Sequence, residues 1–158
     1  MEIERKYMVK TLPDLSTAVC REMERYYLSS NEDEEIRIQR VDQSYSYERK
    51  VKTSKNGRTK ELRAITKTVF DELKQSASRA IVRSSYDLGH NLSIKIYHDT
   101  YEGLVRAEKE FANEKEANAY QPEPWMGPEI TDSPLGRDSR LLTLDRTQFI
   151  QLLDSLRI

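Results

Sequence analysis

A two-residue alternation of polar and apolar side chains recurs along this chain and constrains its fold more than any other feature. At the N-terminus, Glu2, Glu4 and Lys6 alternate with Ile3 and Tyr7. Successive side chains of a β-strand point to opposite faces, so a strand here carries two carboxylates and an ammonium on one face and apolar groups on the other. Eight such segments predict strands at about 2–9, 23–29, 35–42, 45–53, 59–66, 79–87, 92–98 and 104–111.

Helical signals are fewer than strand signals. Three segments with helical character, each preceded by a residue suited to cap a helix (Thr68, Asn113 and Asp145), predict helices at about 69–77, 113–119 and 146–156. Four of the five prolines fall in 121–140, which predicts an ordered irregular loop around a core-anchoring Trp125. Residues 55–58 predict a turn between two strands. An α+β fold is therefore expected, with an antiparallel sheet or barrel and peripheral helices.

Size and charge narrow the classes of partner. A chain of 158 residues is long enough for one domain with a sizeable core, so 1–158 is predicted to be a single domain. Charged residues make up 34% of the chain, yet the net charge is −1, which does not indicate global attraction to nucleic acid or membrane. Any anion binding must come from local arrangement, and a small-molecule partner is expected.

The compartment is inferred from cysteine usage and from hydropathy. Cys20 is the single cysteine, so the chain can form no internal disulfide, which fits a reducing cytosol. The N-terminus is charged from residue 2 and does not resemble a signal peptide, and no apolar run reaches the length of a membrane span. A cytoplasmic location is expected.

The charged strand faces, taken together, supply two sets of residues with opposite charge. The acidic set is Glu2, Glu4, Glu108 and Glu110, and the basic set is Lys6, Arg37, Lys50, Lys52, Arg83 and Lys95. Carboxylates suit Mg²⁺ or Mn²⁺, and lysine and arginine suit phosphate. These are the residue types that phosphoryl transfer needs. The alternative is a sheet whose cross-strand ion pairs face water, and alternation alone leaves both interpretations open.

Several motifs resemble those of the CYTH superfamily, also called triphosphate tunnel metalloenzymes, which includes class IV adenylyl cyclases, thiamine triphosphatases and inorganic triphosphatases. The opening Glu2-x-Glu4-x-Lys6 is similar to the N-terminal signature of that family, and 124–131 is similar to its Pro-Trp-hydrophobic-Gly-x-Glu-Val-Thr segment. Further matches, in the family's order, are Tyr27-Leu28, Arg37, Lys52, Arg83 with Tyr86, and the strand that holds Glu108 and Glu110.

The resemblance implies an eight-stranded antiparallel barrel whose charged faces line a tunnel. It implies that glutamates hold one or two divalent metal ions, Mg²⁺ or Mn²⁺, with Glu2, Glu4, Glu108 and Glu110 as the ligands. It assigns catalytic roles to Lys6, Lys52 and Arg83. Triphosphate or polyphosphate contacts are expected from these three residues and from Arg37, Lys50, Lys95 and Tyr27. A homodimer is a further expectation of the family.

The chain departs from the family pattern at several positions. Gln39 and Ser85 stand where arginines are expected, and Arg83 replaces a lysine. Ser93 and Lys95 replace an acidic pair, the fifth strand lacks its usual glutamates, and 135–137 lacks an Arg-Tyr-Lys run. The predicted function is a metal-dependent phosphohydrolase acting on inorganic triphosphate or a nucleoside triphosphate. The alternatives are a catalytically weak polyphosphate- or nucleotide-binding protein, an adenylyl cyclase of the same fold, and an interaction module with a vestigial tunnel.

Overall fold

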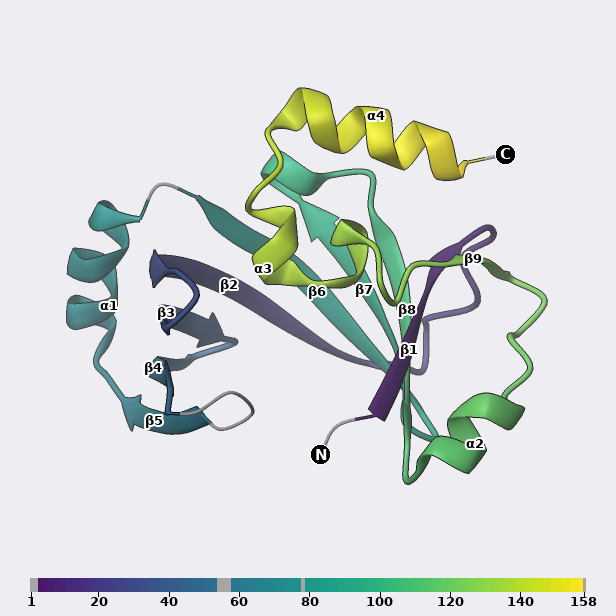
Figure 1. Ribbon diagram of the computed structural model, residues 1–158, viewed down its shortest axis with the longest axis horizontal. Helices are drawn as coiled ribbons and strands as arrows, with labels where there is room; N and C mark the ends of the chain where they lie inside the picture. The colour runs from purple at the N-terminus through teal and green to yellow at the C-terminus, as the bar shows by residue number, and fades with distance from the viewer. Residues whose placement is uncertain (1–2, 54–57, 78, 158) are drawn as a thin grey trace. The chain divides into compact units, whose positions relative to one another are not determined.

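A computed structural model of the protein describes residues 3–53, 58–77 and 79–157, with the side chain of residue 58 left out (Figure 1). Glu2 and residues 55–57 of the turn predicted at 55–58 lie outside this part of the chain. The fold divides into two compact units, one formed by Met1–Arg21 with Arg83–Ile158 and the other by Glu22–Val82. We call them the first and the second unit.

The first unit is built on antiparallel strands. Its strands are β1 (Ile3–Val9), most of β6 (Ala80–Gly89), β7 (Leu92–His98), β8 (Val105–Phe111) and β9 (Met126–Glu129). Within it, β8 lies between β7 and β1, and β9 pairs with the free edge of β1. Its helical segments are η2 (Asp99–Tyr101), α2 (Glu114–Ala119), η3 (Pro134–Gly136), α3 (Asp138–Leu141) and α4 (Arg146–Leu156).

One face of this sheet is apolar, as the alternation predicts. Tyr7, Ala107 and Met126 form a buried cluster, and Val9 and Trp125 pack against it. Trp125 is therefore a core anchor. Since Tyr7 and Ala107 are direct partners in the β1–β8 register, the residues on either side of them in sequence must point to the opposite face.

Two helices of the first unit begin at the predicted caps. Asn113 accepts a hydrogen bond from the backbone of Glu116, and Asp145 and Gln148 form a capping box at the start of α4. Helix α4 buries Phe149 against Tyr101, with ring centroids 5.2 Å apart. Figure 1 shows α2 and α4 at opposite ends of β8. The helix predicted at 146–156 thus packs on the turn before β8.

The second unit is a four-stranded antiparallel meander with one helix. It contains most of β2 (Val19–Ser30), then β3 (Glu34–Val41), β4 (Ser44–Lys52), β5 (Arg58–Ala64), α1 (Lys67–Leu73) and η1 (Lys74–Ser76). Phe70 of α1 packs on Tyr26 and Tyr45, with ring centroids 5.7 and 5.1 Å away. The cap of α1 is Thr66, whose side chain accepts from the backbone of Val69, and not Thr68 as predicted.

Two expectations about the architecture need correction. Residues 121–140, predicted to be irregular, contain β9, η3 and α3. Strand β9 forms because it pairs with β1, which is distant in sequence. The chain therefore has nine strands in its described residues, one more than expected. Among those residues β5 and β9 each have a hydrogen-bonded neighbour on one side, so the predicted antiparallel sheet with peripheral helices is confirmed, but not hydrogen-bonded closure into a barrel. No helix in the described part of the chain is long and apolar enough to span a membrane.

Candidate functional site

The register of β1 and β8 brings predicted site residues onto one face. Glu4 lies directly opposite Glu110, and Lys6 lies directly opposite Glu108. Like charges directly opposite each other on a sheet are destabilising unless something positive lies between or beside them. Lys6 supplies such a charge beside Glu4, since its Nζ lies 3.8 Å from Glu4 Oε1.

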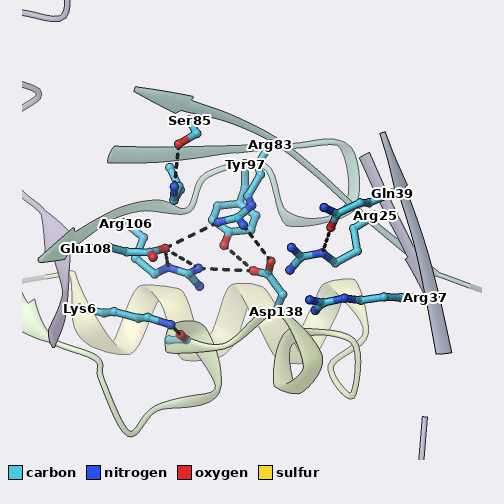
Figure 2. Close-up of polar contacts among 12 residues, drawn as sticks. Lys6, Arg25, Arg37, Gln39, Arg83, Ser85, Tyr97, Arg106, Glu108 and Asp138 are labelled. Atoms are coloured by element: carbon cyan, nitrogen blue, oxygen red, sulfur yellow. Dashed lines mark hydrogen bonds and ion pairs between the residues drawn. The ribbon is translucent and has the colours of Figure 1, made fainter. Parts of the chain in front are cut away.

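Arg106 lies on the same face, two residues before Glu108, and is only 2% exposed. Its Nε and Nη2 donate to Glu108 Oε2 over 2.9 and 2.7 Å, and its Nη1 donates to the carbonyl of Leu135 over 3.0 Å (Figure 2). Hydrogen bonds between charged groups are roughly twice as strong as neutral ones. The guanidinium is thus held firmly against Glu108.

Asp138, at the start of α3, is the second buried carboxylate of this cluster. It accepts a hydrogen bond from Tyr97 Oη over 2.6 Å and lies 3.5 Å from both Arg106 Nη2 and Arg83 Nη2. Arg83 Nη1 also lies 3.6 Å from Glu108 Oε2. Two arginines and two carboxylates therefore alternate around the ring of Tyr97 (Figure 2).

The segment from β9 to α3 reaches this face through backbone carbonyls. Lys6 Nζ donates to the carbonyl of Gly136 over 2.7 Å, beside the Leu135 carbonyl that Arg106 uses. Gly136 is required there, since a Cβ at this position would overlap the carbonyl oxygen of Ile130. The tight turn thus places two acceptors over the charged face.

Lys95 completes the group that we call the first cluster. Its Nζ donates to Ser85 Oγ over 2.6 Å, and β7 places it opposite Arg106 in register. The members of the first cluster are Lys6, Arg83, Ser85, Lys95, Tyr97, Arg106, Glu108 and Asp138. Lys6 and Lys95 thus donate to neutral oxygens, with Glu4 Oε1 3.8 Å from Lys6 Nζ, while the two arginines face the buried carboxylates.

Burial and charge shift the pKa values within the first cluster. Burial alone would raise the pKa of the Glu108 carboxyl, but the charges of Arg106 and Arg83 outweigh it and lower that pKa to about 2. Burial lowers the pKa of both the Lys6 and the Lys95 ammonium, and the charge of Arg106 adds to this effect. A bound polyanion would relieve that cost.

The second unit has a cluster of its own, centred on Glu48, which is 5% exposed. Arg37 donates to Glu48 Oε2 through Nη2 at 2.9 Å and Nε at 3.3 Å, and Lys50 and Lys60 lie 3.6 and 3.4 Å from Glu48 Oε1. Burial opposes ionisation of Glu48, but the hydrogen bonds and charge of Arg37 outweigh it and lower the pKa of its carboxyl. Arg37 Nη1 also donates to Tyr27 Oη over 3.4 Å.

The predicted residues of the second unit share this face. Arg37 lies opposite Glu48, and Glu35 opposite Lys50, so alternation puts Lys52 on the same face at the end of β4. Arg25, on β2, lies opposite Gln39 and donates from Nε to Gln39 Oε1 over 3.1 Å. An arginine of the neighbouring strand thus lies against Gln39.

Sequence reasoning missed several residues of the two clusters. Arg106 and Glu48 carry a signal, because each follows the same alternation as a neighbouring residue that was selected. Tyr97 follows it too, two residues after Lys95. Asp138 has no such signal, because it lies in the segment predicted to be irregular.

The charged faces are not simply solvated. Arg106 and Asp138 are 2% and 7% exposed, which does not fit ion pairs facing water. Within 3–53, 58–77 and 79–157, no three Asp, Glu, His or Cys side chains come close enough together to hold a metal ion. Glu4 and Glu110 are directly opposed in register and carry oxygen ligands of the type that hard divalent cations take, whereas Glu108 is engaged by two arginines.

The chain is similar to known proteins in both sequence and structure. No family model matches the chain. An inorganic triphosphatase of Nitrosomonas europaea is 26% identical over 136 residues, covering 83% of this chain and 89% of that protein. Two solved structures of NE1496, one described as an inorganic triphosphatase and one as a hypothetical protein, align with TM-scores of 0.74 and 0.77 at 24% identity. They cover 89% and 92% of this chain, and 93% and 99% of their own, and so confirm the fold.

Proposed function

We propose, since this chain is a homologue of an inorganic triphosphatase, that it is a metal-dependent phosphohydrolase acting on a triphosphate. Its fold, which is that of the CYTH superfamily, supports the proposal. The assignment to an enzyme class rests on that homology. Inorganic triphosphate is the first candidate substrate, and a nucleoside triphosphate is the second.

The charge of the first cluster supports the proposal most directly. Lys6, Lys95, Arg83 and Arg106 gather on one face, where their charged partners among the described residues are Glu108, Asp138 and Glu4, so the cations outnumber the carboxylates that contact them. A buried excess charge is costly unless a ligand of opposite charge offsets it. A linear polyphosphate carries several negative oxygens at short spacing and would make use of these donors.

Each residue of the first cluster has a proposed role. Lys6 and Lys95 would exchange their neutral acceptors for phosphate oxygens, and Arg83 would hold a phosphate as a fixed charge, since arginine is effectively never deprotonated. Glu108 and Asp138 would orient Arg106 and Arg83. Among the predicted catalytic residues, Lys6 and Arg83 are thus supported by this geometry.

For the second unit, Arg37, Lys50, Lys52 and Tyr27 remain predicted phosphate contacts. Arg37 and Lys50 are supported by their ion pairs with Glu48, which orients them on the face they share. Lys52 remains a predicted catalytic residue through its place on that face. Arg25 is a further candidate through its contact with Gln39.

The divalent cation implied by the family would be held by Glu4 and Glu110, with Glu2 as a further predicted ligand. When bound, Mg²⁺ or Mn²⁺ neutralises phosphate charge and lowers the pKa of a water molecule. The chain's own task is to bind the phosphates in line with that position and to compensate charge on the oxygens around the reacting phosphorus.

A catalytically weak binding protein is the second candidate. The engagement of Glu108 by Arg106 favours it, because a predicted metal ligand is taken up by a guanidinium. Such a protein would bind polyphosphate or nucleotide tightly with little turnover.

Phosphate release from inorganic triphosphate, measured with Mg²⁺ and with Mn²⁺ in separate reactions, tests the proposal. We expect metal-dependent release in the wild type, a loss of at least about tenfold in Glu4→Gln, and no change in the exposed control Glu102→Gln. No release from the wild type would exclude the inorganic triphosphatase and direct the assay to ATP. Tight binding without release from either substrate would establish the binding protein.

A further inference from the structure

The guanidinium of Arg106 contacts Glu108, the residue that the family resemblance implies to be a metal ligand. Its Nε and Nη2 both donate to Glu108 Oε2, and Arg83 Nη1 lies 3.6 Å from the same oxygen. Arg106 is 2% exposed, and its hydrogen bonds to Glu108 join two charged groups. A metal ion could bind this oxygen only by displacing Arg106.

Arg106 is also fixed by groups other than Glu108. Its Nη1 donates to the carbonyl of Leu135 over 3.0 Å, and its Nη2 lies 3.5 Å from Asp138 Oδ1. Asp138 is held in turn by the 2.6 Å hydrogen bond from Tyr97. These contacts come from three separate elements, β7, η3 and α3, so the positive charge is built into the fold of the first unit.

Lys6 and Lys95 supply further positive charge beside this fixed group. They donate to the carbonyl of Gly136 and the hydroxyl of Ser85, which carry no charge, and Glu4 Oε1 lies 3.8 Å from Lys6 Nζ. A fixed guanidinium and two nearby ammonium groups can compensate phosphate charge as a divalent cation does, because phosphate affinity depends on the local positive charge.

We propose that this chain binds triphosphate without a divalent cation, with Arg106 as a phosphate-site charge in place of a metal ion on Glu108. The inference rests on the proposed function and deepens it. Glu108 is then the counterion that orients Arg106, and metal held at Glu4 and Glu110 is needed for turnover but not for binding.

Calorimetric titration with a non-hydrolysable imido analogue of tripolyphosphate tests this, once with EDTA and once with Mg²⁺. We expect dissociation constants within about threefold of each other in the wild type. Arg106→Gln should weaken binding in EDTA at least about tenfold, as expected for loss of a charged hydrogen-bonding group. The matched control Arg63→Gln removes an arginine that is 65% exposed and should leave the affinity unchanged.

Arg106→Gln leaves Glu108 and Asp138 without part of their compensation, so its fold is checked by circular dichroism. If Arg106→Gln does not fold, Lys95→Gln tests the inference in its place. That variant removes a positive charge from the same cluster, and the partner that Lys95 loses, Ser85, is neutral. A loss of about tenfold in EDTA supports the inference. The inference is overturned if a folded Arg106→Gln keeps its affinity in EDTA. If Arg106→Gln does not fold, unchanged affinity of Lys95→Gln in EDTA overturns the inference.

The two conditions separate failure of this inference from failure of the proposed function. Binding that occurs with Mg²⁺ and is absent in EDTA overturns the inference and leaves a metal-dependent triphosphatase. An absence of binding under both conditions, together with an absence of phosphate release from wild type, overturns both.

Discussion

Tyr97 donates its hydroxyl hydrogen to Asp138 Oδ1 over 2.6 Å, and the two residues lie 41 positions apart in sequence. The tyrosine is 1% exposed and the aspartate 7%. This bond connects β7 to α3 and orients a carboxylate that faces both arginines of the first cluster.

Tyr97→Phe should lower the free energy of unfolding by about 1–3 kcal/mol, because it removes a 2.6 Å hydrogen bond to a buried carboxylate. Urea denaturation measures the change. Tyr101→Phe is the matched control, since that buried hydroxyl donates to a backbone carbonyl over a longer 3.3 Å. Equal losses in the two variants would contradict a special role for the Tyr97–Asp138 bond.

The carboxyl of Glu108 should contribute to stability with a defined pH dependence. Its pKa falls from an ordinary 4.5 to about 2 in the folded protein. Ionised Glu108 therefore stabilises the fold above pH 4.5, and this contribution is lost as the pH falls from 4.5 toward 2. Unfolding free energies of the wild type and Glu108→Gln, measured from pH 7 to pH 2, should converge in that interval. A difference that stays constant across it would contradict the assignment.

Binding of tripolyphosphate should take up protons at alkaline pH. Burial lowers the pKa of the Lys6 and Lys95 ammonium groups below 10.5, and a bound polyanion raises it again. Affinity should therefore fall as the pH approaches 10.5. Calorimetry in two buffers of different ionisation enthalpy measures the proton uptake, which Lys95→Gln should reduce and the exposed control Lys67→Gln should not.

Neutralising one member of the Glu4–Glu110 pair should separate stability from metal binding. In EDTA, Glu110→Gln should raise the free energy of unfolding by roughly 0.2–1 kcal/mol, because it removes a repulsion between directly opposed like charges. Mn²⁺ should raise the melting temperature of the wild type, and this rise should disappear in the variant. Glu102→Gln serves as the control, and a variant that keeps the full Mn²⁺ effect would exclude Glu110 as a ligand.

Placing at position 39 the arginine that the CYTH pattern has there should destabilise the protein. Gln39→Arg places a second guanidinium against Arg25, which now donates to the glutamine, at a cost on the order of 1 kcal/mol. The exchange Arg25→Gln with Gln39→Arg should recover most of that stability, because it restores one donor and one acceptor. Thermal melting of the three variants measures this, and an additive effect in the double variant would contradict the coupling.

The strands and their faces could be predicted from sequence because they depend on local alternation. Strand β7 was predicted at its observed ends, and Asn113 and Asp145 cap the helices expected of them. Alternation also predicted the charged faces of the strands, and the register confirms it for Glu4, Glu110 and Arg37.

The tertiary structure decided which charges meet. Nothing local to Asp138 in α3 indicates that Tyr97, Arg83 and Arg106 surround it, because these three residues come from β7, β6 and β8. Strand β9 likewise exists because β1 offers it hydrogen bonds, and Gly136 is needed because Ile130 approaches it. Alternation determines the face on which a side chain lies, whereas its partner depends on cross-strand register and chain crossings. Here those relations converted a predicted metal ligand, Glu108, into the counterion of a buried arginine.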